Sequence, residues 1–352
     1  MDRCERLMNG LQASGIDLAL IHKPENIRYL TGYTGEGNAL IGADKRVILT
    51  DFRYIEQAQN QAPGFEVIRV AGAVKLEEAL ASLIPEGSVL AIEEDCVTVS
   101  QYKSLCDALP GRKLTALAGA PEQLRRTKDA GEAEKIREAC RISCAAFEKL
   151  LPRIHAGMTE KQVQIALEAE LFAQGAEAIS FGTIVASGAN GSLPHAIPSQ
   201  RVLQEGDLVT LDFGATYDGY HADMTRTIAV GPVSEQLEKM YADVLEAQKR
   251  ALAKIRCGVP CKEVDAAARE YLDERYPGAF GHGLGHSVGL LIHESPSFNT
   301  RDTSVLEEGI VITVEPGVYL PGVGGVRIEN TCLVRENGCT PLTTADKQLI
   351  IL

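Results

Sequence analysis

The sequence contains no tryptophan, no excess of basic residues and no apolar run long enough to cross a membrane. The absence of tryptophan excludes no class of function. The formal net charge of −13 at pH 7 argues against nucleic acid or an anionic membrane as a partner, because both would repel an acidic protein. Residues 1–24 interleave charged and apolar residues where a signal peptide would place a basic end before an apolar stretch, so we expect no signal peptide.

The nine cysteines, an odd number, are scattered through segments with helical and strand-like patterns. Cys140 and Cys144 are four residues apart, as are Cys257 and Cys261, which leaves a zinc site open although these spacings match known zinc motifs poorly. We favour buried, reduced thiols, which are typical of intracellular proteins, and therefore predict a cytoplasmic location.

Strand-like and helical segments alternate through the first third of the chain, which at 352 residues is long enough for two domains. The strand-like segments are residues 17–23, 38–44, 46–51, 65–70, 88–94 and 113–119, and the helical ones are residues 3–15, 54–62, 74–84 and 99–109. This alternation predicts a small α/β domain with a mixed sheet. We place the end of that domain within residues 119–126 and expect domains at residues 1–122 and 123–352.

The second domain is expected to combine long helices with paired strands. A long helical stretch with an amphipathic pattern covers residues 118–154. Another helix follows at residues 159–175 with Thr159 as its N-cap, because a threonine side chain can accept a hydrogen bond from the first turn. Two further helices, at residues 234–255 and 261–276, precede a glycine-rich segment with several histidines. Helices that separate pairs of strands in this way predict an α+β layered domain.

Two aspartates, Asp212 and Asp223, lie in the two strands of a predicted β-hairpin, one on each side of its turn. The strand-like runs LVTLDFGAT and YHADMTRTIAV are joined across Asp218-Gly219, a dipeptide that favours a tight type I′ turn. Symmetric pairing about this turn places the two aspartates on one face as diagonal neighbours, roughly 7–8 Å apart at the backbone. Side chains at that spacing can reach two metal ions about 3.5–4 Å apart, and we expect Gly214 to leave the space between them empty. The alternative is an ordinary hairpin with two solvent-facing acids, and a one-residue bulge would separate the pair.

Two glutamates, Glu315 and Glu329, flank a second predicted hairpin. The connecting segment PGVYLPGVGGVRI is rich in turn residues and has its midpoint near Gly322, so a simple hairpin would place the glutamates opposite each other. Pro316 cannot donate to a strand ladder, and the chain should therefore leave regular pairing just after Glu315. Arg327 should face the same side as Glu329, where its charge can hold a carboxylate in position. A surface hairpin with a Glu–Arg ion pair is the alternative, which the apolar character of the flanking strands disfavours.

Three histidines, His282, His286 and His293, lie in the glycine-rich segment GHGLGHSVGLLIHE. Glycines allow the backbone to approach a site closely, and a neutral imidazole is a common ligand for zinc, manganese, iron or cobalt. The four acids of the two hairpins would repel one another in an apolar setting unless cations neutralised them. Two divalent ions supply four positive charges for four negative ones, with a histidine as a neutral ligand. The set therefore predicts a dinuclear metallohydrolase.

The order Asp, Asp, His, Glu, Glu in LDFGATYDGYHADMTRT, HGLGHSVGLLIHE, TVEPG and VRIEN resembles the Xaa-Pro peptidases, the prolidases and aminopeptidase P enzymes with the pita-bread fold. The segments PENIRYLTGYTG and DFRY add a softer N-terminal match. The resemblance implies an α+β protein with a creatinase/prolidase-like α/β domain at residues 1–122 and a pita-bread catalytic domain at residues 123–352. The implied metal ligands are Asp212 on one ion, Asp223 and Glu329 bridging both ions, and His286 and Glu315 on the other.

The resemblance also implies catalytic and substrate-binding residues. Glu315 would be the proton shuttle between the attacking water and the departing proline nitrogen, while His293 and His195 would stabilise the developing oxyanion. The implied substrate-binding residues are His195, His282, His293, Arg301 and Arg327. Arg301 lies where prolidases carry an arginine for the proline carboxylate, although an exposed loop residue is an equal alternative at this position.

The implied function is metallopeptidase hydrolysis of the Xaa-Pro bond at the N-terminus of peptides or in Xaa-Pro dipeptides, by a metal-bridging hydroxide formed near neutral pH. Manganese is the expected metal, with cobalt, zinc and iron as alternatives. The expected partners are a proline-containing peptide substrate and a second copy of the chain in a homodimer. The alternatives are a creatinase-like enzyme that hydrolyses a C–N bond without metal and a non-catalytic pita-bread module that binds other proteins. The choice between dipeptides and longer peptides stays open.

Overall fold

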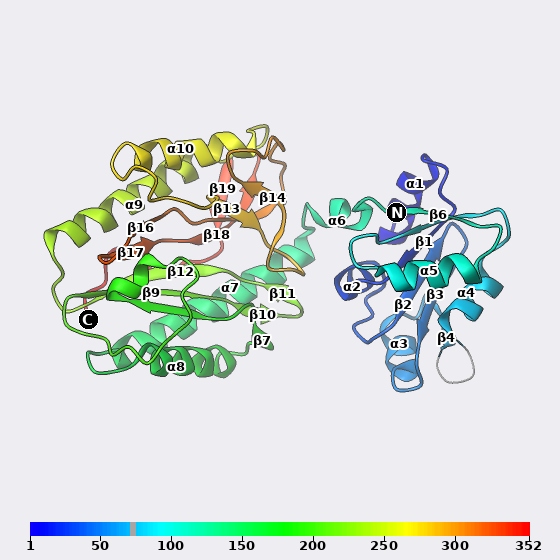
Figure 1. Cartoon of the computed structure of the whole chain (residues 1–352), viewed down its shortest axis with the longest axis horizontal. Helices are drawn as coiled ribbons and strands as arrows, with labels where there is room; N and C mark the ends of the chain where they lie inside the picture. The colour runs from blue at the N-terminus through cyan, green and yellow to red at the C-terminus, as the bar shows by residue number, and fades with distance from the viewer. Residues whose placement is uncertain (71–74) are drawn as a thin grey trace. The chain divides into compact units, whose positions relative to one another are not determined.

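The computed structural model describes residues 1–70 and 75–352, so the first residue of the helix expected at residues 74–84 lies outside the described part. The chain folds into two compact units, Met1–Arg125 and Arg126–Leu352 (Figure 1). Each unit has hydrophobic cores of its own. Among the described residues, no helix combines the length and the apolar character that crossing a membrane requires.

The Met1–Arg125 unit is a mixed sheet covered by helices, with the strand order β4-β3-β2-β1-β5-β6. β2 pairs antiparallel with β1 and β3, while β3 with β4, β1 with β5 and β5 with β6 are parallel, which confirms the predicted mixed sheet. The strands are β1 (Leu18–Ile21), β2 (Asn38–Gly42), β3 (Arg46–Thr50), β4 (Glu66–Arg69), β5 (Val89–Ile92) and β6 (Lys113–Ala116). The helices are α1 (Arg3–Gln12), α2 (Pro24–Thr31), α3 (Ile55–Gln61), α4 (Leu76–Leu83), α5 (Val99–Ala108) and α6 (Ala120–Arg125).

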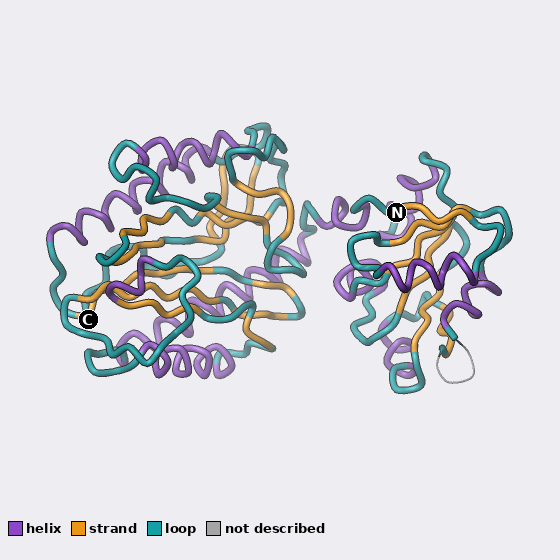
Figure 2. The backbone as a smooth tube through the Cα atoms, in the orientation of Figure 1, coloured by secondary structure: helices purple, strands orange, loops and turns teal. Residues whose placement is uncertain are grey.

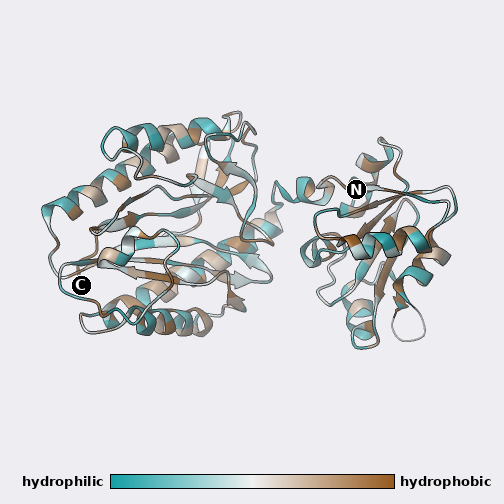
Figure 3. Ribbon diagram, viewed as in Figure 1, coloured by the Kyte–Doolittle hydropathy of each residue, from teal (hydrophilic) through white to brown (hydrophobic). Residues whose placement is uncertain are grey.

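The helix α2 is the element of this unit that the sequence patterns did not predict. Pro24 occupies its first turn, and Gly32 follows its last residue in the left-handed region with φ 81°. Both signals are visible in the sequence, because proline favours the first helical position and glycine the position after the last. The core packs apolar strand residues such as Leu20, Leu40 and Leu49 against apolar residues of the helices α4 and α5. Figure 3 shows hydrophobic residues concentrated in the central strands of this unit.

The Arg126–Leu352 unit, all of whose residues are described, places β-sheets between two pairs of helices. The strand orders of its sheets are β12-β9-β8, β11-β10-β7, β14-β13-β15-β18-β19 and β16-β17. The helices are α7 (Ala130–Leu150), the 3₁₀ turn η1 (Leu151–Arg153), α8 (Glu160–Ala173), the 3₁₀ turn η2 (Gly188–Ser192), α9 (Glu235–Lys254) and α10 (Cys261–Asp273). The strands are β7 (Ala178–Ile179), β8 (Ile184–Ser187), β9 (Asp207–Phe213), β10 (Ala215–Tyr217), β11 (Tyr220–His221), β12 (Met224–Val230), β13 (Gly285–Ser287), β14 (Glu294–Phe298), β15 (Val311–Val314), β16 (Gly317–Leu320), β17 (Gly324–Arg327), β18 (Asn330–Arg335) and β19 (Gly338–Pro341).

The helices of the second unit lie outside its strands (Figure 2). α7 packs along α8 and α9 packs along α10, and the two pairs cover opposite sides of the strands. One core forms between α7, α8 and the sheet of β9 and β12, where Leu211 and Phe213 are fully buried. The other forms between α9, α10 and β15–β18, where Ile328 is fully buried. Because strand side chains alternate, Asp212 and Glu329 face away from these cores, toward the space between the sheets.

The starts of α7 and α8 follow capping rules. The stretch predicted at residues 118–154 is divided into α6 and α7, because Asp129 begins a new helix by accepting the Glu132 N–H at 2.9 Å. Thr159 is the N-cap of α8, as predicted. Its Oγ1 accepts the Gln162 N–H at 3.1 Å, and Gln162 Oε1 accepts the Thr159 N–H at 2.8 Å.

All nine cysteines are free thiols. Cys140 and Cys144 are buried, as expected, but the expectation of burial is wrong for Cys96 and Cys106, which are exposed. The group of His, Cys, Asp and Glu side chains that the described residues bring close enough to share an ion contains no cysteine.

Candidate metal centre

The predicted register of the aspartate hairpin is confirmed. Tyr217 lies opposite Tyr220 across the turn, and Asp212 lies opposite Thr225 in the pairing of β9 with β12. Both pairs belong to one continuous register. Asp212 and Asp223 therefore share one face of the hairpin as diagonal neighbours, the arrangement that two metal ions require.

The turn is the type I′ turn that the sequence predicts, since Asp218 and Gly219 both have positive φ, 42° and 70°. Gly214 has a different role from the expected one. A Cβ at this position would overlap the carbonyl oxygen of Ala222 on the opposite strand. Glycine is required here by the close approach of that backbone and not by the space between the aspartates.

The glutamate hairpin also has its predicted register. β15 pairs with β18 as far as Val314, and β16 begins at Gly317 in its pairing with β17, both in the same register. Glu315 and Glu329 therefore lie opposite each other in the interruption between the two ladders. The interruption coincides with Pro316, as predicted, because proline has no N–H for a strand ladder.

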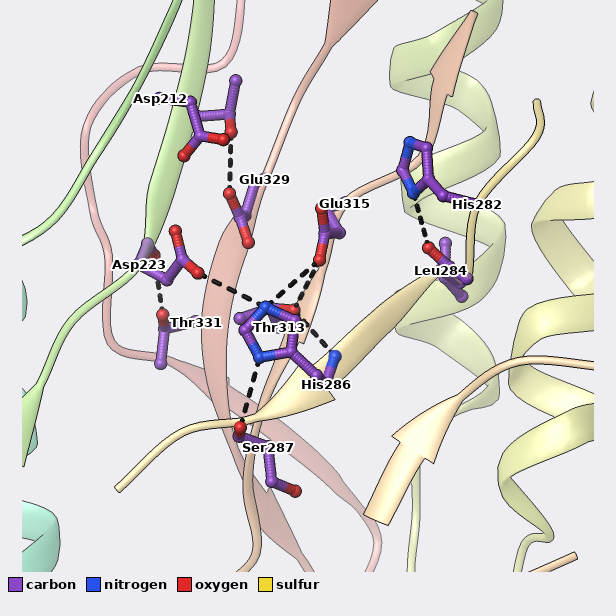
Figure 4. Close-up of polar contacts among 12 residues, drawn as sticks. Asp212, Asp223, His282, Leu284, His286, Ser287, Thr313, Glu315, Glu329 and Thr331 are labelled. Atoms are coloured by element: carbon purple, nitrogen blue, oxygen red, sulfur yellow. Dashed lines mark hydrogen bonds and ion pairs between the residues drawn. The ribbon is translucent and has the colours of Figure 1, made fainter. Parts of the chain in front are cut away.

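The two hairpins bring their four acids around one space together with the His286 ring (Figure 4). His286 Nε2 lies 3.4 Å from Asp223 Oδ2 and 3.5 Å from Glu315 Oε1. One ligand atom each of Asp223, His286 and Glu329 lie within 4.8 Å of one another. Atoms at these separations can share metal ions, because bonds from such ions to nitrogen and oxygen ligands are about 2.0–2.2 Å long.

The acids of this cluster lie close together away from water, so they cannot all be ionised unless cations are bound beside them. Burial, with the charges of Asp212 and Glu315, raises the pKa of Asp223 well above its ordinary value. Burial, with the charges of Asp223 and Glu315, does the same for Glu329. Burial also raises the pKa of Glu315, although neighbouring cationic side chains oppose the rise. Without bound metal ions, these carboxyls retain protons that ordinary carboxylic acids lose. Bound metal ions would displace those protons.

Several carboxylate oxygens of the cluster are buried without a hydrogen-bond partner among the described residues: Asp212 Oδ1, Asp223 Oδ1 and Glu329 Oε1. Buried polar atoms are normally paired, so orphaned oxygens grouped in one place indicate a ligand. Carboxylate oxygens with one imidazole nitrogen form a donor set that suits divalent manganese, cobalt, zinc or iron. The residues present therefore fit a centre of divalent metal ions.

Arg327 is the arginine that contacts this cluster directly. Its Nη2 lies 2.6 Å from Asp212 Oδ2, and its Nε donates to Thr225 Oγ1 at 3.1 Å. Thr225 Oγ1 in turn donates to Glu329 Oε2 at 2.7 Å. The expected support of the neighbouring glutamate is thus indirect, and the ion pair is made with Asp212 of the other hairpin. The sequence could not show this contact, since it joins two strands that are far apart along the chain.

A second buried arginine, Arg226, ties the backbones of the two hairpins together. Its side chain is 1% exposed, and its guanidinium donates to the carbonyl oxygens of Thr225, Glu329, Ala345 and Asp346. Sequence reasoning missed this residue. The signal was present, because an arginine inside the apolar run MTRTIAV can be buried only with several acceptors around its guanidinium.

Tyr319 is another residue that sequence reasoning missed. Its hydroxyl lies 2.8 Å from His282 Nε2 and accepts from Arg327 Nη1, also at 2.8 Å. His282 Nδ1 lies 2.7 Å from the Gly283 carbonyl, so Nδ1 carries the proton and Nε2 accepts the Tyr319 hydroxyl. Burial lowers the pKa of His282 to about 4 and raises that of Tyr319 to about 12. This histidine is therefore neutral near pH 7, and it stands apart from the His286 ring (Figure 4).

The glycine-rich segment brings His286 close to the second hairpin. A Cβ at Gly285 would overlap the Thr313 carbonyl oxygen, so glycine allows the close approach that was predicted. Thr313 Oγ1 accepts the His286 N–H at 3.0 Å and donates to Glu315 Oε1 at 3.2 Å. The rings of His286 and His293 pack edge to face with their centroids 4.3 Å apart. Burial and the nearby His286 lower the pKa of His293, which favours the neutral imidazole.

The loop that carries His195 is held by a buried carboxylate. Glu160 Oε1 accepts from the N–H and hydroxyl of Ser187, both at 2.7 Å, and Glu160 Oε2 accepts from the N–H and hydroxyl of Ser199 at 3.0 and 2.6 Å. Asn190 Nδ2 adds contacts to both oxygens. Burial alone would raise the pKa of Glu160, but these hydrogen bonds lower it. An ionised carboxylate thus fixes both ends of the loop.

One pocket of about 570 Å³ collects every residue that the sequence predicted for the site. The predicted residues that line it are His195, Asp212, Asp223, His282, His286, His293, Arg301, Glu315, Arg327 and Glu329. Apolar walls come from Phe181, Ile184, Ile292 and Phe298, none of which the sequence singled out. The pocket therefore combines a polar, metal-compatible face with apolar surface that can take an uncharged side chain.

Comparison with known proteins agrees with this geometry. Residues 134–336 match the family model of metallopeptidase family M24, and residues 3–127 match that of the creatinase/prolidase N-terminal domain. An Xaa-Pro dipeptidase of Pyrococcus furiosus is 36% identical over 99% of both chains. Among solved structures, an Xaa-Pro dipeptidase from Bacillus anthracis is 41% identical with a TM-score of 0.94 over 99% of both chains. An X-Pro aminopeptidase from Thermotoga maritima is 40% identical with a TM-score of 0.91 over 100% of both chains.

These matches confirm the two-domain α+β architecture with a pita-bread unit that the sequence predicts. They also favour a metal-dependent peptidase over a metal-free C–N hydrolase or a non-catalytic module. The chain belongs to metallopeptidase family M24 and carries the creatinase/prolidase N-terminal domain ahead of its metallopeptidase unit.

Proposed function

We propose that this metallopeptidase is a dinuclear, divalent-metal-dependent exopeptidase that hydrolyses the bond between an N-terminal residue and proline. The observation that carries the proposal is the cluster of four carboxylates that lines one pocket with His286, in which Asp212, Asp223 and Glu329 each hold a buried oxygen without a hydrogen-bond partner among the described residues. The substrate class is supported by relatives named Xaa-Pro dipeptidase and X-Pro aminopeptidase, which match over nearly the whole chain. Residues 123–352 would form the catalytic domain and residues 1–122 the N-terminal domain.

The proposed ligand assignment follows the order of the acids around the space. Asp212 would bind one ion, Asp223 and Glu329 would bridge both, and His286 and Glu315 would bind the other. The short distances from His286 Nε2 to Asp223 and Glu315 support the second half of this assignment. Arg327, in its ion pair with Asp212, would hold that carboxylate for its ion.

Divalent ions bound there would neutralise the cluster and supply Lewis-acid activation of a water molecule and of the scissile carbonyl. Glu315 is the proposed proton carrier. Its carboxylate would take a proton from water and later give it to the proline nitrogen, from its position in the pocket beside His286. The Thr313 hydroxyl, which donates to Glu315 Oε1 at 3.2 Å, would keep the carboxyl in one orientation during both steps.

His293 and His195 are proposed to stabilise the negative charge that develops on the carbonyl oxygen. Both line the pocket, and the lowered pKa of His293 keeps its ring neutral, so that one nitrogen can donate an N–H. A donor of this kind typically lowers the free energy of the transition state by ~2.7–4 kcal/mol. His282, whose Nδ1 proton and Nε2 acceptor are both engaged, would shape the site and bind substrate through contact, not through proton transfer.

Arg301 is proposed to bind the carboxylate of the proline in a dipeptide. It lines the pocket from an exposed loop position, and its backbone N–H donates to Asn299 Oδ1 at 2.9 Å, which fixes the loop. Relatives at nearly equal identity are named as a dipeptidase and as an aminopeptidase, so peptide length must be decided by assay. Comparing turnover of Ala-Pro with that of Ala-Pro-Ala makes the decision, because rapid cleavage of the tripeptide contradicts a strict dipeptidase.

The test of the proposed function is metal analysis of the purified protein, paired with an Xaa-Pro assay after chelation and after return of Mn²⁺, Co²⁺, Zn²⁺ or Fe²⁺. We expect two ions per chain, loss of activity on chelation and recovery that is greatest with Mn²⁺. Activity that survives exhaustive chelation would support the creatinase-like alternative. A metal-replete protein that turns over neither peptide would support the binding module.

We further propose that the protein is a cytoplasmic homodimer. The nine free thiols support a reducing compartment. The dimer is expected from the resemblance to the prolidases, and sedimentation at micromolar concentration tests it, since a monomer alone would refute it.

A further inference from the structure

A buried ion pair lies next to the proposed oxyanion histidine. Lys128 Nζ is 3.1 Å from Glu294 Oε2, and the two side chains are only 1% and 7% exposed. Lys128 is held in place just ahead of α7, where its N–H donates to the Gly309 carbonyl at 2.8 Å. Neither residue lines the pocket or takes part in the proposed chemistry. Burying a lysine costs free energy unless a partner compensates the loss of hydration, so the burial of Lys128 depends on its ion pair with Glu294.

The Glu294 carboxylate is the centre of the loop between β13 and β14. Its Oε1 accepts the Leu291 N–H at 3.1 Å. A Cβ at Gly289 would lie 2.6 Å from both carboxylate oxygens, so the backbone at this residue packs directly against the carboxylate. The Gly289 N–H donates to the Leu291 carbonyl at 3.0 Å, and its carbonyl accepts the His221 N–H at 2.9 Å. The loop therefore wraps around one charged group.

This loop connects two functional histidines. Ser287 pairs with Glu294, with a register shift just before it, so His286 and His293 lie at the two ends of the wrapped segment. His293 lines the pocket, while the adjacent Glu294 directs its carboxylate to Lys128. Glu294 directly follows His293 in the chain and its carboxylate holds the Leu291 N–H, so a shift of this carboxylate can pass to the backbone that carries the His293 imidazole.

We propose that Lys128 and Glu294 are positioning residues that place His293 for catalysis. The kinetic part of this inference rests on the proposed peptidase function. Loss of the lysine removes the ion pair that orients the Glu294 carboxylate, and the loop that packs around this carboxylate then shifts with it. His293 would be displaced from the carbonyl oxygen of the scissile bond. The substrate would still bind to the other residues of the pocket.

The kinetic test is a double-mutant cycle of K128M and H293A. We expect K128M to lower kcat about 10–100-fold with KM changed less than about 3-fold, since a misplacement of about 1 Å can cost that much. In the H293A background K128M should add less than about 2-fold, because the residue through which it acts is gone. K128R should retain most of the activity. Losses that add fully in the double variant would refute positioning through His293.

A second measurement does not depend on activity. Selective ¹³C labelling of the imidazoles gives one signal for each of the seven histidines in the Zn²⁺-loaded protein, and H293A assigns the signal of His293. We expect E294Q, which keeps the shape of the side chain, to shift this signal, as K128M should. The control K239M breaks a lysine ion pair with Asp243 on the remote helix α9 and should leave it unchanged.

The two proposals can fail separately. An unchanged His293 signal in E294Q and K128M refutes the positioning role whatever the enzyme hydrolyses. A wild-type protein without Xaa-Pro turnover refutes the proposed function, while the shifted signal would still support the positioning role. If K128M does not fold, E294Q alone supplies the spectroscopic comparison and replaces it in the cycle with H293A.

Discussion

Replacing Asp223 by asparagine should stabilise the metal-free protein while weakening metal binding. The substitution keeps the shape of the side chain and removes its charge from a buried cluster of acids. It does not disturb the backbone, because the Asp223 contact with Thr331 Oγ1 uses the main-chain carbonyl at 2.7 Å. The effect on stability therefore isolates the electrostatic conflict among the carboxylates, which is the physical basis for a cationic centre in this pocket.

The direction of the change follows from proton linkage. Burial and the charges of Asp212 and Glu315 raise the pKa of Asp223 in the folded state. The stability contributed by such an acid is fully present below its unfolded pKa of about 3.9 and is lost as pH rises through the folded value. Each unit of rise corresponds to about 1.4 kcal/mol of unfolding free energy. D223N removes the ionisable group and should therefore raise Tm at pH 7, by about 2–4 °C for each kcal/mol recovered in a unit of this size.

Thermal unfolding followed by circular dichroism, with chelator and with saturating Mn²⁺, measures both parts of the prediction. The wild type should gain about 2.7 kcal/mol for each bound ion at a hundredfold excess of metal over Kd, and D223N should gain less than the wild type. D243N is the matched control. Burial opposes ionisation of Asp243, but hydrogen bonds led by Lys239 lower its pKa, so this variant should lose stability in both conditions. A D223N protein that unfolds below the wild type in chelator would refute the reasoning.

Three further predictions follow from the site. Binding of Mn²⁺ should release protons held by Asp223 and Glu329, whose pKa values are raised, so affinity should increase with pH. Calorimetry in buffers of different ionisation enthalpy measures the release, and a binding enthalpy that is the same in all buffers contradicts it. R301A should raise KM for Ala-Pro about 10-fold or more, the loss expected for a charge-assisted contact, and change KM for Ala-Pro-Ala much less; equal losses would exclude a carboxylate anchor. Y319F removes the hydroxyl that joins Arg327 to a neighbouring histidine and should lower kcat about 10-fold with unchanged metal content; unaltered kinetics would show that this contact is dispensable.

The positions of the two acid pairs could be predicted because the register of each hairpin depends on local chemistry. Asp218-Gly219 favours one turn type, and that turn determines which residues of β9 and β12 face each other. Pro316 marks the interruption beside Glu315 for an equally local reason, the missing N–H. Strand alternation then determines which side chains share a face. None of these steps requires knowledge of how the sheets pack.

The contacts between segments that are far apart in the sequence could not be predicted in the same way. The ion pair of Arg327 with Asp212 and the pair of Lys128 with Glu294 join residues 115 and 166 positions apart in sequence. Such partners are chosen by the packing of layers, and each residue alone resembles an ordinary surface charge. Tyr319 was missed for the same reason, because its neighbours become visible only when β16 is placed against the glycine-rich segment.

The shared register on both sides of the Glu315–Glu329 pair affects how the chain can tolerate insertions. The tip of the hairpin, residues 321–323, is exposed. Residues added there extend the hairpin outward and leave both ladders aligned, whereas one residue added beside Pro316 would turn a glutamate to the opposite face. That tip is therefore the best place for natural changes in length. An inserted affinity tag or fluorescent reporter should be tolerated there for the same reason.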